Sequence, residues 1–362
     1  MNFIAATTSY EEWLTAQISI VPGDVVAKHE AMTSGGFAFL RATYYRWAQL
    51  FPEREPMIAD APAVLAVGDL HVENFGTWQD AQSRLVWGVN DFDELERLPY
   101  TNDLVRLGTS AMLAASEERL ALDEEHACAL LLEGYRAGLE AGGRPFVLEH
   151  HHRWLRDLVA AAIKTPERWW RDLGKLPLAE ERPAEALALI EQLSPGRSWE
   201  PTVRARRAGM GSLGQQRLVA VGPFEGAPAA REVKQLAPPA GVWLGARTAG
   251  ASELPNGTGR AADPLHVIRA GWVGRRLAPD SVKLDLGDFS RHADRRLLHA
   301  MGVETANIHL CDEAAIGDVR QHVNQLTKDN LAGAARRMAV LLEHDRKQWQ
   351  AVGARDRCQV SH

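Results

Sequence analysis

Two carboxylates and a carboxamide are spaced in the segment 68–93 as phosphoryl transfer requires. Asp69 is followed five positions later by Asn74, and Asp91 comes after the next short apolar run. A carboxylate at the first position can accept the proton of an attacking hydroxyl. An amide and a second carboxylate can hold Mg²⁺ between the phosphates of a nucleotide. We therefore predict Asp69 as a catalytic base and Asn74 and Asp91 as metal ligands.

Two further side chains of this segment are candidates, each with an alternative role. His71 is a second candidate for the catalytic group, and its alternative is to stack within its own loop. Asp93 competes with Asp91 for the metal, and we favour Asp91 because it lies closer to the end of the apolar run. The alternative for Asp69 and Asn74 is an ordinary turn, because Asp and Asn side chains hydrogen-bond to their own backbone.

A glycine-rich segment far downstream supplies a second half of the same kind of site. Residues 209–214 read Gly-Met-Gly-Ser-Leu-Gly, and a lysine follows on a predicted strand at position 234. Glycine lets the backbone approach phosphates closely, and a strand lysine can reach the α- and β-phosphates. A Rossmann-type site would need a helix after the glycines, but residues 218–221 (Leu-Val-Ala-Val) indicate a strand. The predicted phosphate-binding residues are Gly209, Gly211, Ser212, Gly214 and Lys234.

The pattern of apolar residues predicts the elements that must position these groups. A buried strand over 63–67 leads into the loop of Asp69, and a hairpin over 77–89 carries the chain from Asn74 to Asp91. Residues rich in Gly, Pro and β-branched side chains indicate a small β-rich part over 201–275. Helices are predicted over 8–50, 103–142, 147–195 and 289–349, with breaks near Pro166, Pro177 and Pro183 and a stop at 194–196.

The two blocks stand in the reverse of the order that a kinase uses, because the catalytic loop comes first and the glycine-rich hairpin second. A circular permutation explains this order, and it is tolerated when the ends and the new cut lie at the surface. We predict an α+β, two-lobed, kinase-like fold that is circularly permuted. Its parts are a large catalytic lobe (1–197), a small nucleotide-clamping β-lobe (198–280) and helices that return to the large lobe (281–362).

The chain resembles an uncharacterised bacterial family, domain of unknown function 2252. The resemblance implies a kinase-like fold related to the aminoglycoside and choline phosphotransferases, with no settled substrate. It also implies that Asp103 braces the catalytic loop. The similarity extends from about Lys28 to the 340s. It is carried by the sequences at 37–41 (Phe-Ala-Phe-Leu-Arg), 68–76 (Gly-Asp-Leu-His-Val-Glu-Asn-Phe-Gly), 90–94 (Asn-Asp-Phe-Asp-Glu), 209–214 and 233–234 (Val-Lys).

One part of the kinase pattern is missing from the sequence. No predicted helix has a convincing Glu to pair with Lys234, and the weak candidate Glu253 lies in a predicted loop. A non-catalytic, nucleotide-binding role therefore stays open beside the catalytic one. Ordinary loop flexibility for the glycines and a solvated position for Lys234 are the alternatives to phosphate binding.

Composition and charge narrow the class of protein. The chain of 362 residues has a formal net charge of −6, which gives no support to nucleic-acid binding. It has no apolar run of the roughly 18 residues that span a bilayer, and its first residues lack the basic start of a signal peptide. Its three widely spaced cysteines fit neither a disulfide framework nor a zinc site. We therefore expect a cytoplasmic protein with no membrane partner.

These features together predict an ATP- and Mg²⁺-dependent phosphotransferase. It would move the γ-phosphoryl group to a hydroxyl of an unidentified acceptor, for example a small molecule. Adenylyl transfer on the same fold and the non-catalytic role are the alternatives, whereas a Rossmann-type oxidoreductase would leave the segment 68–93 unexplained. Neither the acceptor nor the oligomeric state follows from the residue pattern.

Overall fold

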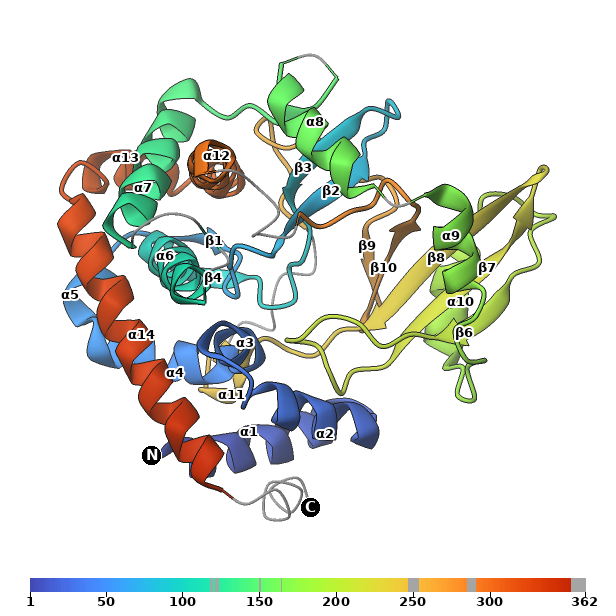
Figure 1. Ribbon diagram of the computed structural model, residues 1–362, viewed down its shortest axis with the longest axis horizontal. Helices are drawn as coiled ribbons and strands as arrows, with labels where there is room; N and C mark the ends of the chain where they lie inside the picture. Colours follow the sequence, from blue (N-terminus) through green and yellow to red (C-terminus); the bar gives the residue numbers. More distant parts are fainter. Residues whose placement is uncertain are drawn as a thin grey trace.

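Helices alternate with short antiparallel strands, so the protein is of mixed α+β class (Figure 1). The computed structural model describes residues 1–352 except 118–119, 121–123, 150, 164, 247–253 and 285–290. The helices are α1 (Phe3–Gln17), α2 (Pro22–Ala31), α3 (Gly36–Ala42), α4 (Tyr44–Arg54), α5 (Pro56–Ala59), α6 (Tyr100–Ser116), α7 (Glu124–Ala141), α8 (Arg153–Ala162), α9 (Pro166–Leu173), α10 (Ala184–Gln192), α11 (Ala240–Trp243), α12 (Arg291–His309), α13 (Ile316–His322) and α14 (Lys328–Ala351). The strands are β1 (Ala63–Ala66), β2 (Phe75–Gln79), β3 (Leu85–Val89), β4 (Glu96–Pro99), β5 (Phe146–Val147), β6 (Thr202–Ala205), β7 (Arg217–Phe224), β8 (Ala227–Gln235), β9 (Val267–Arg269) and β10 (Trp272–Leu277).

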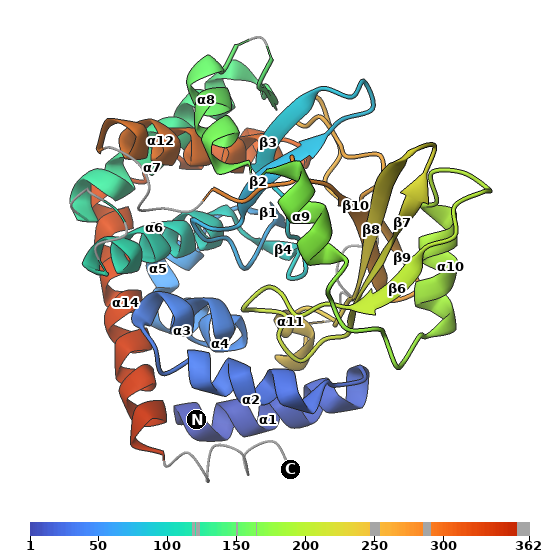
Figure 2. The same ribbon diagram turned by 45° about the vertical axis from the view of Figure 1, so that its right-hand side comes forward.

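A helical part is built around α6. This helix contacts both α7 and α14, and α12 packs along α7 (Figures 1 and 2). Because neighbours cover several of its sides, α6 buries residues around its whole circumference, including the charged Asp103 and Arg106. The long helix α14 begins with a capping box, in which Thr327 Oγ1 accepts a hydrogen bond from Asn330 N at 3.1 Å. The helices predicted at both ends of the chain are confirmed.

The strand β1 and the hairpin β2–β3 carry the segment 68–93. β1 is the predicted apolar strand, and it pairs with β4. In the hairpin, Phe75 lies opposite Val89, so Asn74 and Asn90 are neighbours, and Asn90 N donates to Asn74 O at 3.3 Å. Both the predicted strand and the predicted hairpin are confirmed. The end of β1 and the two open ends of the hairpin lie next to each other.

A five-stranded antiparallel sheet follows later in the chain, with strand order β6-β7-β8-β10-β9. The glycine-rich segment connects β6 to β7, and Lys234 lies in the central strand β8. Side chains alternate between the two faces of such a sheet. The β-rich character predicted for 201–275 is therefore confirmed in the described residues of that range.

Two helices cover the two faces of this sheet (Figure 2). α10 packs on one face, where Leu189 joins Leu218 and Val233 in one apolar cluster. α9 packs on the other face, where Leu173 lies with Val219. Pro166 is the first residue of α9 and Pro183 precedes α10, as the predicted breaks require. Both helices therefore pack with the sheet, although the predicted boundary at 197/198 groups them with the first part of the chain.

Two connections join the sheet to the helical part. After β10 the chain runs beside β2, where Thr77 N donates to Val282 O at 2.9 Å and Val282 N donates to Thr77 Oγ1 at 3.0 Å. On the other side, Val21 N at the start of α2 donates to Gly214 O at 2.8 Å. Elsewhere, no helix among the described residues is both long and apolar enough to cross a bilayer.

Candidate functional site

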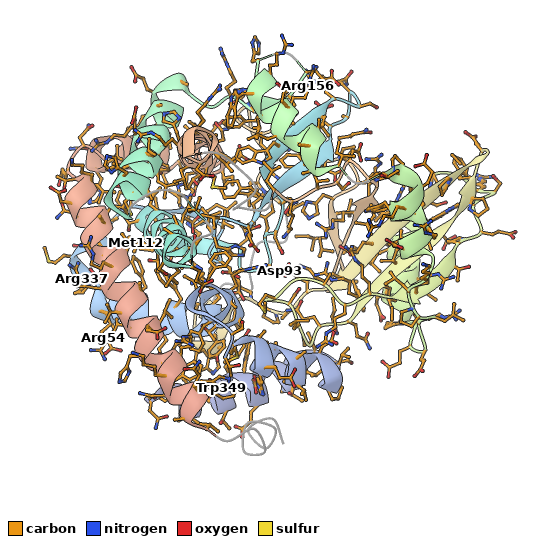
Figure 3. All side chains as sticks on the ribbon, viewed as in Figure 1. Arg54, Asp93, Met112, Arg156, Arg337 and Trp349 are labelled. Atoms are coloured by element: carbon orange, nitrogen blue, oxygen red, sulfur yellow. The ribbon has the colours of Figure 1, made fainter. Side chains whose placement is uncertain are left out.

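Lys234 and two Asp residues meet between the five-stranded sheet and the β2–β3 hairpin. The Lys234 ammonium contacts Asp91 Oδ1 at 3.1 Å and forms a second ion pair with Asp93. Lys234 comes from the central strand of the sheet, while both carboxylates follow β3. Figure 3 shows Asp93 near the centre of the molecule, between the helical part and the sheet. The two sequence blocks therefore come together in space.

Asp103 of α6 holds the turn that precedes Asp69. Its carboxylate accepts hydrogen bonds from Val67 N at 2.7 Å and from Gly68 N at 3.0 Å. Gly68 has a φ of +77°, and a Cβ there would lie 2.8 Å from Tyr44 Oη, so the turn strongly favours glycine. The bracing contact expected of Asp103 is confirmed, and it fixes the direction in which the Asp69 side chain leaves the backbone.

A buried arginine holds Asp69 from α6. Arg106 is fully buried and donates from Nε to Asp69 Oδ1 at 2.9 Å, while its Nη2 pairs with the same oxygen. The guanidinium lies over the rings of Tyr44 and Trp47, 4.8 and 5.0 Å from their centroids. Burial raises the pKa of Asp69, and Arg106 opposes part of that rise. The other oxygen, Oδ2, faces the glycine-rich segment, where a Cβ on Gly211 would be 3.3 Å away.

Two hydrogen bonds fix the amide group of Asn74. Its Nδ2 donates to the backbone oxygens of Asp69 at 3.1 Å and Asp91 at 3.2 Å. Because both partners are acceptors, the amide nitrogen must face them and Oδ1 must face elsewhere. Oδ1 is buried, and within the described residues it has no hydrogen-bond partner. A buried oxygen that lacks a donor suits a hard cation such as Mg²⁺.

The two carboxylates after β3 differ in their ionisation. Burial would raise the pKa of Asp91, but Lys234 and other nearby cations hold it well below its usual range. Burial and the neighbouring Asp91 raise the pKa of Asp93 to about 6. Asp91 is therefore the firmly ionised member of the pair, which favours it as the metal ligand. Over the described chain, no three His, Cys, Asp or Glu side chains cluster closely enough to hold a metal. A Mg²⁺ ion commonly takes only one or two carboxylates and completes its shell with phosphates and water.

The glycine-rich segment lies across the Asp69 loop. Gly209 has a φ of +82°, and Gly211 approaches both Asp69 Oδ2 and the Arg41 carbonyl oxygen, 3.3 and 3.2 Å from a Cβ built on it. Ser212 is 8% exposed, and its Oγ accepts a hydrogen bond from Arg217 Nη2 at 2.9 Å. A side chain on Gly211 would therefore contact the candidate base.

Gly214 has a different position from the other predicted phosphate-binding residues. Its φ is +100°, and a Cβ there would lie 3.0 Å from Val25 Cγ2 on α2. It lines neither of the two cavities described below, whereas Gly209, Gly211 and Ser212 line at least one. Gly214 therefore anchors the segment to α2.

His71 lies at the edge of the site in a neutral form. Its Nδ1 accepts a hydrogen bond from Glu73 N at 3.2 Å, and its ring packs edge-on against Phe37. Burial, with Arg41 and other nearby cations, lowers the pKa of His71 well below its usual value. The side chain lines the smaller cavity but makes no hydrogen bond to Asp69. His71 therefore forms part of the wall of the smaller cavity.

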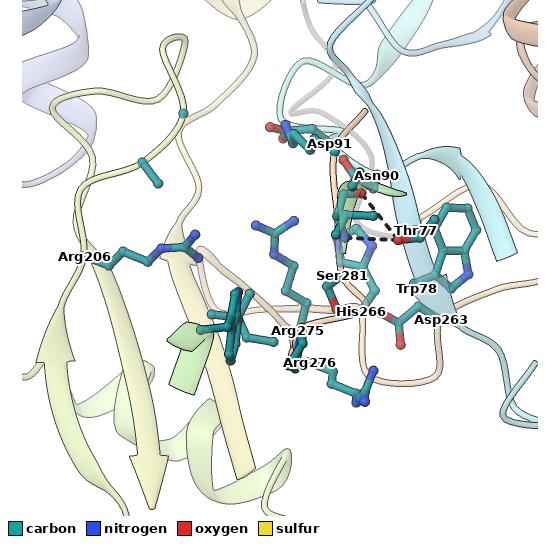
Figure 4. A pocket seen from close by; sticks show the side chains of 18 of the residues that line it. Thr77, Trp78, Asn90, Asp91, Arg206, Asp263, His266, Arg275, Arg276 and Ser281 are labelled. Carbon is teal, nitrogen blue, oxygen red and sulfur yellow. Dashed lines mark hydrogen bonds between the residues drawn. The ribbon is translucent and has the colours of Figure 1, made fainter. Parts of the chain in front are cut away.

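A cavity of about 740 Å³ opens between the sheet and the hairpin (Figure 4). Asn90, Asp91 and Gly209 lie on its wall, and Lys283 borders it as well. In Figure 4, Arg206 and Arg275 extend from the sheet into the space that Asn90 and Asp91 border. The arginines of the described chain that line it are Arg41, Arg206, Arg217, Arg260, Arg275 and Arg276. Arg41, Arg260 and Arg276 each pair with a carboxylate of their own. The positive charge left for an anionic ligand such as a polyphosphate is therefore on the side of the sheet and at Lys283.

The same cavity has an apolar section. Trp78 of β2, Leu158 of α8, Trp169 of α9 and Leu277 at the end of β10 line it. Ligand cavities commonly combine apolar walls with a few polar groups that fix orientation. The cavity therefore has room and surface for a flat apolar group beside its cationic section.

Glu232, two positions before Lys234 on β8, organises the arginines. Its carboxylate accepts from Arg217 Nη1 at 2.9 Å and from Arg275 Nε at 2.8 Å, and it pairs with Arg206. Burial would raise the pKa of Glu232, but these three cations hold it well below its usual range. One buried carboxylate thus positions three guanidinium groups, which leaves net positive charge at the cavity wall.

A second, smaller cavity of about 50 Å³ lies on the other side of Asp69. Asp69, Asn74 and the glycine-rich segment border it, and so do Tyr10 of α1 and Lys28 of α2. The segment 209–213 therefore separates two spaces that both reach the segment 68–93. The candidate base stands beside the smaller space.

The sequence offered only a weak candidate, Glu253, for the acidic partner of Lys234. Glu253 lies outside the described residues, and within them Lys234 pairs with Asp91 and Asp93. Other members of the site were not predicted. Arg106 could have been found, since it lies three positions after Asp103 on the same helix face. The pairing of Arg275 with Glu232 depends on the register of β10 against β8, for which the sequence carries no local signal.

A family model described as an uncharacterized protein conserved in bacteria (DUF2252) matches residues 20–164. The match includes Asp69, Asn74, Asp91 and Arg106 and ends before the glycine-rich segment. The predicted resemblance is thus found for this part of the chain, and its expected extension to the 340s lies outside the match. No curated protein and no solved structure matches the chain.

Proposed function

We propose that this protein is a MgATP-dependent phosphotransferase that moves the γ-phosphoryl group of ATP to a hydroxyl of its acceptor. The observation that carries the proposal is the meeting of two distant blocks, 68–93 and 209–234, around one cationic cavity. Phosphoryl transfer needs positioning and charge neutralisation more than covalent chemistry. The cavity supplies both, with Asp91, Lys283 and several arginines on its wall.

The fold we propose with this function is a circularly permuted, two-lobed, kinase-like fold. Its support is positional: the glycine-rich segment joins the first two strands of an antiparallel sheet, and the lysine lies on the third. That is the arrangement by which kinases clamp a nucleotide. The segment with Asp69, Asn74 and Asp91 belongs to the helical part and faces this sheet. Its earlier place in the chain is what a permutation produces.

In the reaction, the acceptor oxygen forms a bond to the γ-phosphorus as the bond from that phosphorus to the β,γ-bridging oxygen breaks. ADP leaves with the electron pair, and the hydroxyl proton passes to Asp69 Oδ2. Arg106 holds Oδ1 and so points Oδ2 at the glycine-rich segment. A pKa raised by burial makes Asp69 a better proton acceptor than an ordinary carboxylate. Lys234 and the arginines bind and orient the phosphates.

The donor set fits a divalent metal. Asn74 Oδ1 and the ionised Asp91 would hold Mg²⁺, which neutralises phosphate charge when it is bound. Asp91 has a side chain that is 34% exposed, so its carboxylate is accessible from the cavity. Lys234 Nζ contacts Asp91 Oδ1 at 3.1 Å, which keeps the ammonium beside the position proposed for the metal and the phosphates.

Thermal unfolding with and without MgATP tests the proposal. A ligand at one hundred times its Kd stabilises the native state by about 2.7 kcal/mol, which is roughly a few degrees of Tm for a chain of this length. We expect this shift in the wild-type protein, and its loss in Asp91→Ala and Lys234→Ala. Lys175→Ala, a change at an exposed lysine, is the matched control and keeps the shift. No Mg²⁺-dependent shift with any nucleoside triphosphate would reject the proposal.

One observation favours a second reading, in which the protein binds nucleotide without turnover. Lys234 pairs with the candidate metal ligands, and the described residues offer it no helix Glu. Nucleotide binding without ADP release across a broad acceptor panel would support this reading. Adenylyl transfer is separated from phosphoryl transfer by product mass, because the acceptor gains either an AMP group or a phosphoryl group.

A further inference from the structure

The smaller cavity is lined by hydrogen-bonding groups that have no partner among the described residues. It lies beside Asp69 and is bordered by Tyr10 of α1, Lys28 of α2 and Tyr44 of α4. These helices come from the N-terminal part of the chain, which lies below α6 and β4 in Figure 1. Neither the proposed metal site nor the proposed nucleotide clamp uses these three side chains.

Of these three side chains, Lys28 gives the strongest evidence for a binding site. It is 6% exposed, and among the described residues no ion pair or hydrogen bond involves its ammonium. The nearby carboxylates are engaged elsewhere: Asp69 pairs with Arg106, and Glu11 binds His29 at 2.7 Å. A buried ammonium without a partner is costly, and proteins normally pair such groups. The cavity in front of Lys28 is where a partner can enter.

The two tyrosines add hydrogen-bond donors to the same space. Tyr10 is 6% exposed and Tyr44 is 5% exposed, and within the described chain neither hydroxyl has a hydrogen-bond partner. Burial and nearby carboxylates such as Glu94 raise the pKa of both tyrosines well above the usual value, so the hydroxyls stay protonated. Tyr44 Oη lies next to the turn at Gly68, 2.8 Å from a Cβ built there. Protonated hydroxyls and an ammonium together bind oxyanions.

The acidic groups around this cavity do not compete for that role. Glu94 Oε2 accepts a hydrogen bond from Ala240 N at 2.7 Å, so this carboxyl group already has a partner. Asp91 and Asp93 already pair with Lys234. The cavity therefore has an ammonium and two hydroxyl donors that suit a group that accepts hydrogen bonds and carries negative charge.

We propose that this cavity binds the acceptor, and that the acceptor is an anionic alcohol whose carboxylate or phosphate is held by Lys28, Tyr10 and Tyr44 while its hydroxyl faces Asp69. The assignment of the reacting hydroxyl rests on the proposed function, because it uses Asp69 as the base. The anion site itself rests on the three unpartnered groups alone. The positive charge of Lys28 excludes a cationic amino-alcohol such as choline from this cavity.

The size of the cavity adds a mechanical requirement. The smaller cavity is far narrower than the larger one, about 50 Å³ against about 740 Å³. The glycine-rich segment forms one wall, with Gly211 close to Asp69. This segment must withdraw from Asp69 when the acceptor enters.

Matched alcohols test the proposal. Glycerol 3-phosphate and glycerate carry an anionic group, glycerol has the same carbon skeleton without charge, and choline carries the opposite charge. The Tm of the wild-type protein, of Lys28→Met and of Lys175→Met is measured with each compound. We expect at least one of the two anions to raise the Tm of the wild type and of Lys175→Met, and we expect Lys28→Met to lose that shift. The comparison of the two anions distinguishes a carboxylate from a phosphate.

The outcomes separate this proposal from the proposed function. No shift with either anion, an equal shift in Lys28→Met, or a shift with choline instead would overturn it. A Lys28-dependent anion shift without any MgATP shift would uphold the anion site and reject the phosphotransferase. Lys28→Met also remains informative about folding: without ligand its Tm should equal or exceed that of the wild type, because the substitution removes a buried unpaired charge.

Discussion

Lys234 and Asp91 are separated by 143 positions in the chain, and their Nζ and Oδ1 atoms lie 3.1 Å apart. This contact links the central strand of the sheet to the end of the β2–β3 hairpin. Each group neutralises the charge of the other, so a change at either residue leaves an uncompensated charge between the sheet and the hairpin.

Asp69→Asn separates catalysis from nucleotide binding. The amide can still accept from Arg106, but it cannot accept the hydroxyl proton. We expect phosphoryl transfer to fall by about 10²–10⁴-fold, the usual contribution of a general base. The Tm should also fall, because Arg106 loses its buried counter-charge, yet MgATP should still raise it. Turnover is measured as ADP release with a working acceptor. Full turnover in the variant would show that Asp69 is not the base.

Asn74→Ala should weaken the metal requirement specifically. The variant loses the free Oδ1 and the two hydrogen bonds from Nδ2 to the Asp69 and Asp91 backbone. We expect the Mg²⁺ concentration for a half-maximal ATP-dependent Tm shift to rise by about tenfold or more, as for other disturbed metal sites. Titration of Mg²⁺ at fixed ATP measures this. An unchanged Mg²⁺ titration would remove Asn74 from the ligand set.

Gly211→Ala should impair turnover more than stability. The new methyl group would sit 3.3 Å from Asp69 Oδ2 and 3.2 Å from the Arg41 carbonyl oxygen, which leaves no space for a phosphate or hydroxyl between them. Gly317→Ala in α13 is the control, because a Cβ there meets nothing within 4 Å. We expect turnover to fall about tenfold or more in Gly211→Ala and to stay unchanged in the control. Equal rates in the two variants would contradict the position assigned to the glycine-rich segment.

Glu94→Gln should change how stability depends on pH. The pKa of Glu94 is raised from 4.5 to about 8 by burial, so between these values the folded protein holds a proton that the unfolded chain releases. The free energy of unfolding therefore falls as pH rises through this window, and the loss is complete above the folded pKa. Glutamine does not titrate and can keep the hydrogen bond from Ala240 N. The variant should gain Tm relative to wild type between about pH 5 and about pH 8, whereas parallel Tm profiles would contradict the raised pKa.

Local elements of the site were predictable from the sequence. An apolar run followed by Gly68-Asp69 is typical of a buried strand entering a turn, and the structure has that strand at Ala63–Ala66. The polar turn between two apolar runs predicts the hairpin, and its register places Asn74 beside Asn90. The strand that carries Lys234 and the β-rich region around it are confirmed as well. These features depend on residues that are close together in the chain. The periodicity of apolar residues along the sequence therefore indicates them.

Contacts between distant elements were not predictable in the same way. Helical spacing shows that α10 has an apolar face, but not that the face packs on the sheet around Val233. The same holds for Lys28, whose position between charged and apolar residues on α2 is typical of a surface lysine. Its burial depends on how α2 packs against α1 and the glycine-rich segment. Such packing is decided by the whole chain, so one sequence does not reveal it.

The attachment of α2 to the glycine-rich segment has a kinetic consequence. Val21 N binds Gly214 O at 2.8 Å, and Asp24 on the same helix pairs with Arg207 at 3.2 Å. A displacement of α2 would therefore move both the proposed phosphate-binding segment and the wall that contains Lys28. Binding of one proposed substrate would then change the affinity for the other. We expect a sequential mechanism through a ternary complex, visible as intersecting double-reciprocal plots when both substrates are varied.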